Sequence, residues 1–399
     1  MNPVRHSFIS NGATQNKKMS NGVKIIYIAD TRLPTEMAHG LQIMKMCEAF
    51  VKRGTELELV VPRRFRISEL GEKDPFEYYK VEKIFKIQKI FCFDLTPLNR
   101  FLGPVSFLIQ ALSFSFFASI YLLFKKADII YGRDRFSLFF VSFFKKNIIF
   151  EVHKIHKFFF QRILRSVKKI VVITNGLRDF LIKNGVKENK ILIAPDGIDL
   201  EDFNIRENEE QCRKILNLPI NKKIVLYTGH LYKWKGVETL ALASEYLDKN
   251  ILIVIVGGIK WYLSNFKKFI KKNNLKNILI LGYQDYSKIP YFLKAADYLV
   301  LTGTKKSDVS KYQTSPMKMF EYMASKKPII ASDLPSFREV LNKTNAILVQ
   351  PDFPRKMAEA IMWALNDENL AQRISNKAYK DVQNYTWDNR GKIILEFIV

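Results

Sequence analysis

Residues 315–333 read Ser315-Pro-Met-Lys-Met-Phe-Glu-Tyr-Met-Ala-Ser-Lys-Lys-Pro-Ile-Ile-Ala-Ser-Asp333. This stretch predicts a loop, an amphipathic helix, a turn and a short buried strand in succession. Lys318 and Glu321 lie one turn apart near the start of the predicted helix. A cation and a carboxylate at that spacing suit a ligand that carries both phosphate and sugar hydroxyl groups.

Short apolar runs recur throughout the chain and are separated by helical or loop segments. They comprise 23–30, 57–62, 128–131, 147–151 and 169–174 in the first half, and 223–229, 250–257, 277–282, 297–301 and 328–331 in the second. Strands that alternate with helices predict an α/β fold with two Rossmann-like, doubly wound parallel sheets. Two such halves would face each other across a cleft, with ligands at the carboxyl ends of the strands.

The boundaries of the two halves follow from changes in composition. Residues 1–20 are polar and contain no apolar core segment, so we expect a flexible tail and no signal peptide. We expect residues 21–198 to form the first domain and residues 199–380 the second, which starts with a charged linker region at 199–221. The last helix, about 380–399, is a candidate to pack back on the first domain.

Composition narrows the possible partners. The 399 residues are enough for two domains with substantial cores, and a formal net charge of +25 comes from 64 Lys and Arg against 39 Asp and Glu. Such a charge favours nucleic acid, anionic lipid or nucleotide phosphates as partners, with a Lys-rich genome as the alternative explanation. Three cysteines without metal-ligand spacing favour a reducing compartment over a disulfide framework.

Residues 101–124 contain no charged side chain and, as a helix, would be about 36 Å long, enough to span a bilayer. A strand expected at 128–131 argues against a span, because the two parts of one sheet would then lie on opposite sides of the membrane. A core helix of the first domain and a helix partly immersed in the membrane interface are the two other interpretations. Basic and aromatic runs at 139–146 and 157–160 support the interfacial one and favour lipid over RNA.

Three further segments lie where a ligand in the cleft would bind. The turn Thr228-Gly-His-Leu-Tyr-Lys-Trp-Lys-Gly236 follows an expected strand and suits a phosphate, with a solvated basic loop as the alternative. His153 follows the strand expected at 147–151, and a purely structural histidine is the alternative. The loop 34–40 joins the first strand to the first helix. No Asp, Glu or His cluster has metal-ligand spacing, so we expect no metal cofactor.

The amino-acid sequence of residues 315–324 resembles the nucleotide-binding segment of retaining GT-B glycosyltransferases of the family 4 type, also called glycosyltransferase group 1. Supporting segments follow in the expected order from about Val23 onward. The resemblance implies that Glu321 contacts the ribose of a nucleotide-sugar donor. It also implies that the backbone amides of Thr314 and Ser315 face the donor diphosphate, with Lys318 close by.

The resemblance extends to the glycine turn and to a second glutamate position. Lys235 matches the family lysine that holds the donor diphosphate together with the turn at Gly229, whereas His230 replaces the family arginine. Gln313 stands eight positions before Glu321, where the family has the carboxylate that contacts the transferred sugar. Its amide keeps hydrogen-bonding capacity without the charge.

On the first domain, the resemblance implies a histidine near the donor sugar and a loop beneath the donor phosphates. His153 matches that histidine, so His153 and Gln313 are the candidate catalytic residues. Gly40 is expected to bring the loop backbone near a ligand, with Glu36 or His39 facing the acceptor instead. Ala194-Pro-Asp-Gly-Ile-Asp199 resembles the family hinge Pro-Asn-Gly-Val-Asp.

The resemblance thus implies transfer of a hexose-type sugar from a nucleotide-sugar donor, without metal or other cofactor, to a lipid-linked or surface-glycan acceptor such as lipopolysaccharide or capsule. Charge and the 101–124 segment add an anionic membrane surface as a partner, and we expect a cytoplasmic protein bound peripherally to the inner membrane face. No nucleic-acid partner is expected. A GT-B nucleotide-sugar epimerase and a non-catalytic GT-B membrane or partner-binding subunit are the alternatives.

Overall fold

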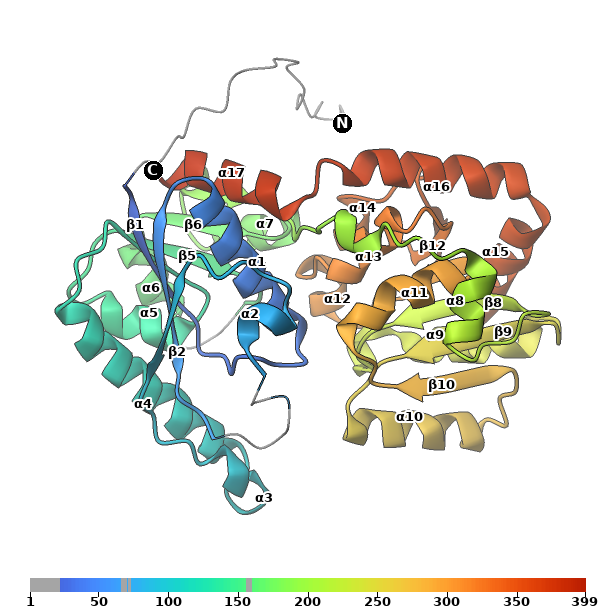
Figure 1. Cartoon of the computed structure of the whole chain (residues 1–399), viewed down its shortest axis with the longest axis horizontal. Coiled ribbons are helices and arrows are strands. Elements are labelled where there is room, and N and C mark those ends of the chain that lie inside the picture. The colour runs from blue at the N-terminus through green and yellow to red at the C-terminus, as the bar shows by residue number, and fades with distance from the viewer. Residues whose placement is uncertain (1–21, 66–69, 71–72, 156–159) are drawn as a thin grey trace.

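The computed structural model describes residues 22–65, 70, 73–155 and 160–399. Two parallel sheets of seven and six strands lie side by side, and helices cover both faces of each (Figure 1). This arrangement confirms the expected α/β fold with two Rossmann-like, doubly wound domains. The expected tail at 1–20 and most of the run at 157–160 lie outside the described residues.

The first sheet has the strand order β3-β2-β1-β4-β5-β6-β7. Its strands are β1 Lys24–Ile28, β2 Glu56–Pro62, β3 Lys86–Ile90, β4 Ile129–Gly132, β5 Ile148–Val152, β6 Lys169–Val172 and β7 Ile191–Ile193. Its helices are α1 Ala38–Lys52, α2 Pro75–Tyr78, α3 Asn99–Leu102, α4 Pro104–Leu123, α5 Arg135–Val141, α6 Phe160–Ser166 and α7 Asn175–Lys183. The order reverses between β1 and β4, which is where ligands bind in such sheets.

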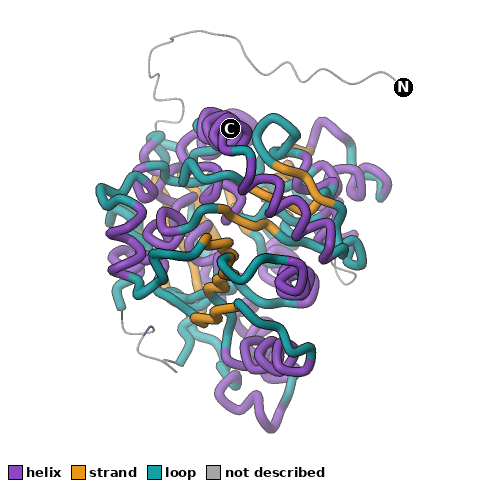
Figure 2. Tube along the Cα trace, turned by 90° about the vertical axis from the view of Figure 1, so that its right-hand side faces the viewer, coloured by secondary structure: helices purple, strands orange, loops and turns teal. Residues whose placement is uncertain are grey.

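The second sheet has the order β10-β9-β8-β11-β12-β13, with its reversal between β8 and β11. Its strands are β8 Lys223–Thr228, β9 Ile251–Val256, β10 Ile278–Gly282, β11 Tyr298–Leu301, β12 Ile329–Ser332 and β13 Ile347–Val349. Its longer helices are α8 Glu209–Ile215, α9 Val237–Ala243, α10 Lys260–Lys272, α11 Ile289–Ala295, α13 Met317–Ala324, α15 Pro354–Asn366 and α16 Glu368–Val382, and its shorter ones are α12 Asp308–Tyr312 and α14 Pro335–Arg338. Figure 2 shows these strands between helices on both sides.

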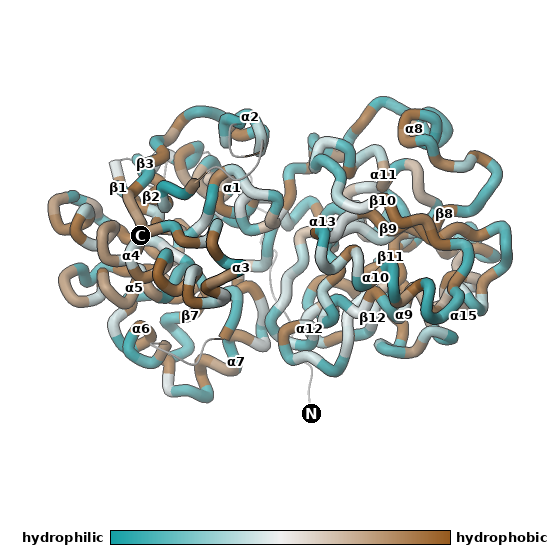
Figure 3. Tube along the Cα trace, turned by 90° about the horizontal axis from the view of Figure 1, so that it is seen from below, coloured by the Kyte–Doolittle hydropathy of each residue, from teal (hydrophilic) through white to brown (hydrophobic). Residues whose placement is uncertain are grey.

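Both sheets are buried on both faces, because successive residues of each strand point to opposite sides. In β1, Ile25 and Tyr27 join the core under α1, whereas Ile26 and Ile28 join the core under α4 and α5. In β8, Val225 and Leu226 separate in the same way between two further cores. Continuous apolar strands are therefore required, and Figure 3 shows β8 and β9 as hydrophobic segments running through the second domain.

Three strands were not expected from the sequence: β3, β7 and β13. Each lies at an edge of its sheet and is short or partly polar, so its apolar signal is weak. The charged stretch 199–221, expected as a linker region, differs as well, because it contains α8. This helix begins with a capping box of Asn208 and Gln211 and buries Cys212 in the core of the second domain.

The C-terminal helix α17, Trp387–Ile398, leaves the second domain after α16 and lies along α1 of the first domain (Figure 1). Trp387 and Ile394 are buried in the first-domain core. Gly391 allows the close approach of the two helices, since a Cβ atom there would lie 2.9 Å from Cβ of Ala49. The last helix therefore ties the two domains together.

Helix α4 covers one face of the first sheet, and the strands on either side of it in sequence, β3 and β4, belong to that same sheet. Phe114, Ala118 and Leu122 pack into the core, while much of the opposite face is exposed. Among the described residues, α4 is the one helix long and apolar enough to cross a membrane by length and composition, and 44% of its most apolar window is buried. Core helices of soluble proteins, which are mostly buried, can have the same length and composition.

Truncating Ile394 tests how strongly α17 holds the first domain. The side chain is fully buried, so we expect Ile394→Ala to lower the free energy of unfolding by about 2–5 kcal/mol, measured by urea denaturation. Lys392→Ala on the exposed side of the same helix is the control and should change it by no more than about 0.5 kcal/mol. Equal urea midpoints for Ile394→Ala and the wild type would contradict this role of α17.

Candidate functional site

A cavity of about 620 Å³ lies between the two domains, where the carboxyl ends of both sheets meet. Its lining comes from the loop after β1, from the ends of β4, β5 and β7, from the turn after β8 and from the start of α13. The site residues expected from the sequence that line it are Glu36, His39, His153, Gly229, His230, Lys235, Gln313, Thr314, Ser315, Lys318 and Glu321. The fold thus gathers residues nearly 300 positions apart into one site.

Lys318 is the central cation of the second-domain wall. Its side chain is only 8% exposed, and Nζ donates a hydrogen bond of 2.6 Å to the carbonyl oxygen of Thr228. Nζ also lies 3.5 Å from the centroid of the Tyr227 ring. Burial, followed by repulsion from Lys235, lowers the pKa of Lys318 well below its ordinary value. The ammonium lies near no described carboxylate within salt-bridge distance, so an anionic ligand would relieve this cost.

The glycine turn after β8 places a second cation and a histidine beside Lys318. Gly229 has a φ of +120°, and a Cβ atom there would lie 3.1 Å from Nζ of Lys318. Burial lowers the pKa of Lys235 to about 8. Burial and the charges of Lys235 and Lys318 lower the pKa of His230 to about 4, so this histidine is neutral at pH 7. The two lysines therefore carry the positive charge of this wall.

Glu321 lies one turn beyond Lys318 on α13 and provides a hydrogen-bond acceptor on the same wall of the cavity. Its Oε1 accepts a hydrogen bond of 3.1 Å from the hydroxyl of Tyr286. Burial raises the pKa of Glu321 to about 7, although Tyr286 and Lys318 act in the opposite direction. A carboxylate beside two buried ammonium groups can accept hydroxyl hydrogens while the cations hold phosphate.

The loop before α13 joins the two domains at the cavity. Oε1 of Gln313 accepts a hydrogen bond of 3.2 Å from the backbone N–H of Ile155 in the first domain. Oγ of Ser315 accepts one of 3.2 Å from the backbone N–H of Asp196 in the interdomain hinge. Thr314 is buried between these two residues and also lines the cavity. The polar side chains of this loop thus hold the domains in a fixed relation.

His153 is positioned from behind by a buried carboxylate. Its Nε2 lies 2.7 Å from Oε1 of Glu151, which also accepts hydrogen bonds of 2.8 Å from Arg390 of α17 and from Gln42 of α1. Burial alone would raise the pKa of Glu151, but the charge of Arg390 and the bond to His153 bring it well below its ordinary value. Burial and Arg133 lower the pKa of His153, so it faces the cavity as a neutral ring at pH 7.

The loop 34–40 meets the expectations only in part. Glu36 lines the cavity and forms an ion pair of 2.8 Å with Arg32, and His39 lines it with Nε2 2.7 Å from Oγ1 of Thr31. Gly40 does not line the cavity, so its expected place beside a ligand is corrected. A Cβ atom there would lie 2.2 Å from the hydroxyl oxygen of Tyr79, and this close packing explains the glycine.

Sequence reasoning missed several cavity residues, among them Arg133, Tyr283 and Tyr286, and it assigned Asp196 to the hinge without placing it in the cavity. Each follows the carboxyl end of a strand, and that position was the signal that could have found them. Arg133 donates a short hydrogen bond to Oε1 of Gln42. Within the described ranges, no group of three or more His, Cys, Asp or Glu side chains is placed to hold a metal ion.

Replacing Lys318 tests whether the site keeps its buried charge at a cost to stability. Because the folded-state pKa lies below the unfolded value, the protonated lysine destabilises the fold below that pKa, and the penalty fades as the pH rises toward 10.5. We expect Lys318→Met to raise the free energy of unfolding at pH 7 by about 1 kcal/mol, and by less at pH 10. Urea denaturation at both pH values measures this effect.

Lys306→Met, which changes an exposed lysine, is the control for this measurement and should leave the free energy of unfolding unchanged. A lower stability of Lys318→Met at pH 7 would contradict the prediction. It would mean that the contacts with Thr228 and Tyr227 outweigh the desolvation of the ammonium.

Comparisons with known proteins agree with this geometry. Residues 40–202 match the family model described as Glycosyltransferase Family 4, and residues 208–381 match the one described as Glycosyl transferases group 1. The uncharacterized glycosyltransferase MJ1069 of Methanocaldococcus jannaschii is 27% identical over 231 residues, 56% of each chain. The capsular polysaccharide biosynthesis glycosyltransferase CapM of Staphylococcus aureus is 23% identical over 272 residues, 61% of this chain and 62% of CapM.

The sequence alignments cover little more than half of the length of these relatives. The similarity in structure, by contrast, extends over nearly the whole of both chains. HepE of Anabaena, solved in complex with UDP-glucose, superimposes with a TM-score of 0.72 at 17% identity, over 94% of this chain and 98% of HepE. At that identity the likeness concerns the fold. Since family models match both halves, the chain belongs to the GT-B glycosyltransferases, of the family 4 and group 1 type.

Proposed function

We propose that this protein is a retaining glycosyltransferase that transfers a hexose-type sugar from a nucleotide-sugar donor to a lipid-linked or surface-glycan acceptor. One observation carries the proposal: Lys318, Lys235 and Glu321 line a single cavity of about 620 Å³. Two partly or fully buried ammonium groups suit a diphosphate, and the carboxylate suits the hydroxyls of a ribose. Family membership and the UDP-glucose bound by the structural neighbour HepE support the donor class.

The proposed reaction breaks the bond between the anomeric carbon and the diphosphate oxygen and forms a bond from that carbon to an acceptor oxygen. The two lysines would stabilise the charge that develops on the leaving diphosphate, which is the largest electrostatic demand of the step. The acceptor proton would pass to the leaving phosphate oxygen, in line with the front-face route that the family resemblance implies. His153 and Gln313 would contact the transferred sugar, and no metal or other cofactor is required.

A screen of nucleotide sugars tests this function directly. We expect one of the UDP-, GDP-, ADP- and CMP-sugars, well above its dissociation constant, to stabilise the protein by about 2–4 kcal/mol, seen as a raised melting temperature. The same ligand should shift Lys318→Ala much less, because the diphosphate loses its buried cation. A panel without any shift would remove the donor proposal, and donor turnover without an acceptor would favour the epimerase alternative.

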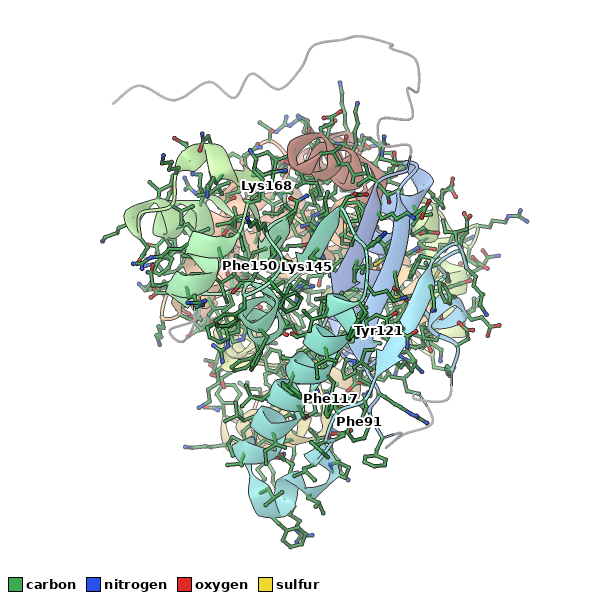
Figure 4. The ribbon with its side chains drawn as sticks, turned by 90° about the vertical axis from the view of Figure 1, so that its left-hand side faces the viewer. Phe91, Phe117, Tyr121, Lys145, Phe150 and Lys168 are labelled. Carbon is green, nitrogen blue, oxygen red and sulfur yellow. The ribbon has the colours of Figure 1, made fainter. Side chains whose placement is uncertain are left out.

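We also propose that the protein acts at the cytoplasmic face of the membrane and binds it through the α3–α4 face. This face consists of exposed apolar side chains of α3, α4 and the segment after β3: Phe91, Phe93, Phe101, Leu102, Val105, Phe107, Leu108, Phe116, Ile120 and Leu123. Figure 4 shows Phe91, which directly follows β3, close to Phe117 of α4, and their ring centroids lie 5.2 Å apart.

Helix α4 buries polar and apolar residues together on one side and exposes large apolar side chains on the other. Its buried side combines Ser106, Gln110, Ser115 and Ser119 with Ala111, Phe114, Ala118 and Leu122, whereas Phe107, Phe116 and Leu123 are among the large apolar side chains that are exposed. At the end of the helix, Lys125, Lys126 and Lys145 gather around the exposed Phe124. An apolar face beside a basic cluster fits an anionic lipid surface, where the rings enter the interface and the ammonium groups contact headgroups.

Flotation with vesicles of phosphatidylglycerol and phosphatidylcholine at low salt tests the α3–α4 face. We expect the wild type to float, and the triple variant Phe101→Ser, Phe107→Ser, Phe116→Ser to bind at least tenfold more weakly. Trp363→Ser, which changes an exposed aromatic on α15 of the second domain, should float like the wild type. Failure of the wild type to float, or equal flotation of the triple variant, would contradict the membrane proposal and leave the donor proposal intact.

A further inference from the structure

One carboxylate oxygen in the cavity has no hydrogen-bond partner. Among the described residues, Oδ1 of Asp196 is the only buried carboxylate oxygen without one, and the residue is 7% exposed. The other carboxylates of the cavity are engaged, Glu36 by Arg32 and Glu321 by Tyr286. Because a buried carboxylate without a donor is costly, its persistence at a cavity wall points to a ligand that supplies the donor.

The backbone around Asp196 is held in place from both domains and from α17. Its N–H donates to Oγ of Ser315, and Nε of Arg390 donates a hydrogen bond of 2.9 Å to the carbonyl oxygen of the preceding Pro195. At Gly197, an added Cβ atom would lie 2.9 Å from the backbone nitrogen of Trp387. A carboxylate fixed in this way keeps its geometry before a ligand arrives, as binding sites require.

The position of Asp196 relates it to the sugar end of the proposed donor. The diphosphate end is defined by Lys318 and Lys235, and the ribose end by Glu321. Asp196 lies instead with His153, because Arg390 donates hydrogen bonds both to Glu151, which holds His153, and to the carbonyl oxygen of Pro195 beside Asp196. His153 is the residue that the family resemblance places near the donor sugar.

Because position 313 is a glutamine, the sugar end of the cavity needs a carboxylate from another residue. The family carboxylate that contacts the transferred sugar is absent at this position, and the oxygen of the amide that replaces it already accepts a hydrogen bond from Ile155. The hinge shows the opposite exchange: the carboxylate of Asp196 stands where the family motif has the amide of asparagine. Asp196 in the hinge and Gln313 in the loop before α13 line the same cavity.

We propose that Asp196 accepts hydrogen bonds from hydroxyl groups of the transferred sugar, in the role that Gln313 lacks the charge to perform. The inference rests on the proposed donor binding and adds the residue that distinguishes a nucleotide sugar from its nucleoside diphosphate. A carboxylate oxygen accepts stronger hydrogen bonds from hydroxyl groups than an amide oxygen does.

Calorimetric titration with three ligand pairs tests the proposal: UDP and UDP-glucose, GDP and GDP-mannose, ADP and ADP-glucose. For the pair that the wild type binds most tightly, Asp196→Asn should leave the affinity for the diphosphate within twofold and weaken that for the nucleotide sugar about tenfold or more. Asp202→Asn is the matched control, because this hinge carboxylate pairs with Lys80 outside the cavity and should change neither affinity. Thermal unfolding checks that each variant is folded, and Asp196→Ala replaces Asp196→Asn if the latter is not.

The double variant Asp196→Asn, Gln313→Glu restores the family combination and should regain most of the lost affinity for the nucleotide sugar. A single variant that keeps this affinity within twofold overturns the inference. A double variant as weak as the single one overturns the exchange of roles between positions 196 and 313. A wild type that binds none of the three diphosphates overturns the proposed function itself, which is a distinct result.

Discussion

The buried ion pair between Glu151 and Arg390 is the interaction on which the arrangement of this molecule depends. Nη2 of Arg390 lies 2.8 Å from Oε1 of Glu151, and both side chains are almost completely buried. The pair connects the middle of the first sheet with a helix that the chain adds last, after it has finished the second domain. Removing one partner of such a pair leaves a buried charge without compensation, which typically costs about 3–5 kcal/mol.

The same pair orders the site. Glu151 holds His153 at the cavity, while Arg390 also donates hydrogen bonds to the carbonyl oxygens of Ala194 and Pro195 in the hinge. The position of the C-terminal helix therefore determines both a first-domain residue of the cavity and the course of the chain between the domains. The pair contributes more to this positioning than to net stability, because desolvation offsets much of the attraction between buried charges.

The fold was predictable from local patterns where strands are central, and less so at the edges. Central strands such as β8 and β9 are buried on both faces and read as continuous apolar runs. Edge strands such as β3, Lys86–Ile90, include polar residues because one side meets solvent, so they lack that signal. In the site, Lys318, Glu321 and Lys235 were recognisable because they lie in one segment or follow a glycine turn. Arg133 stood in a short, ordinary stretch, and the hinge motif around Asp196 did not mark that residue as part of the cavity. Only the convergence of strand ends shows that both line it.

The sequence by itself determined the α/β class, the two domains, the family resemblance and the residues of the cationic wall, because these depend on periodicity and on spacing within short segments. Tertiary structure decided which distant groups meet: Gln313 with Ile155, Ser315 with Asp196, and Arg390 with Glu151. It also decided that α4 buries Ser106, Ser115 and Ser119 while it exposes Phe107 and Phe116. The physical reason is that burial, and with it the cost or benefit of each polar and apolar group, is a property of the packed chain and not of local spacing.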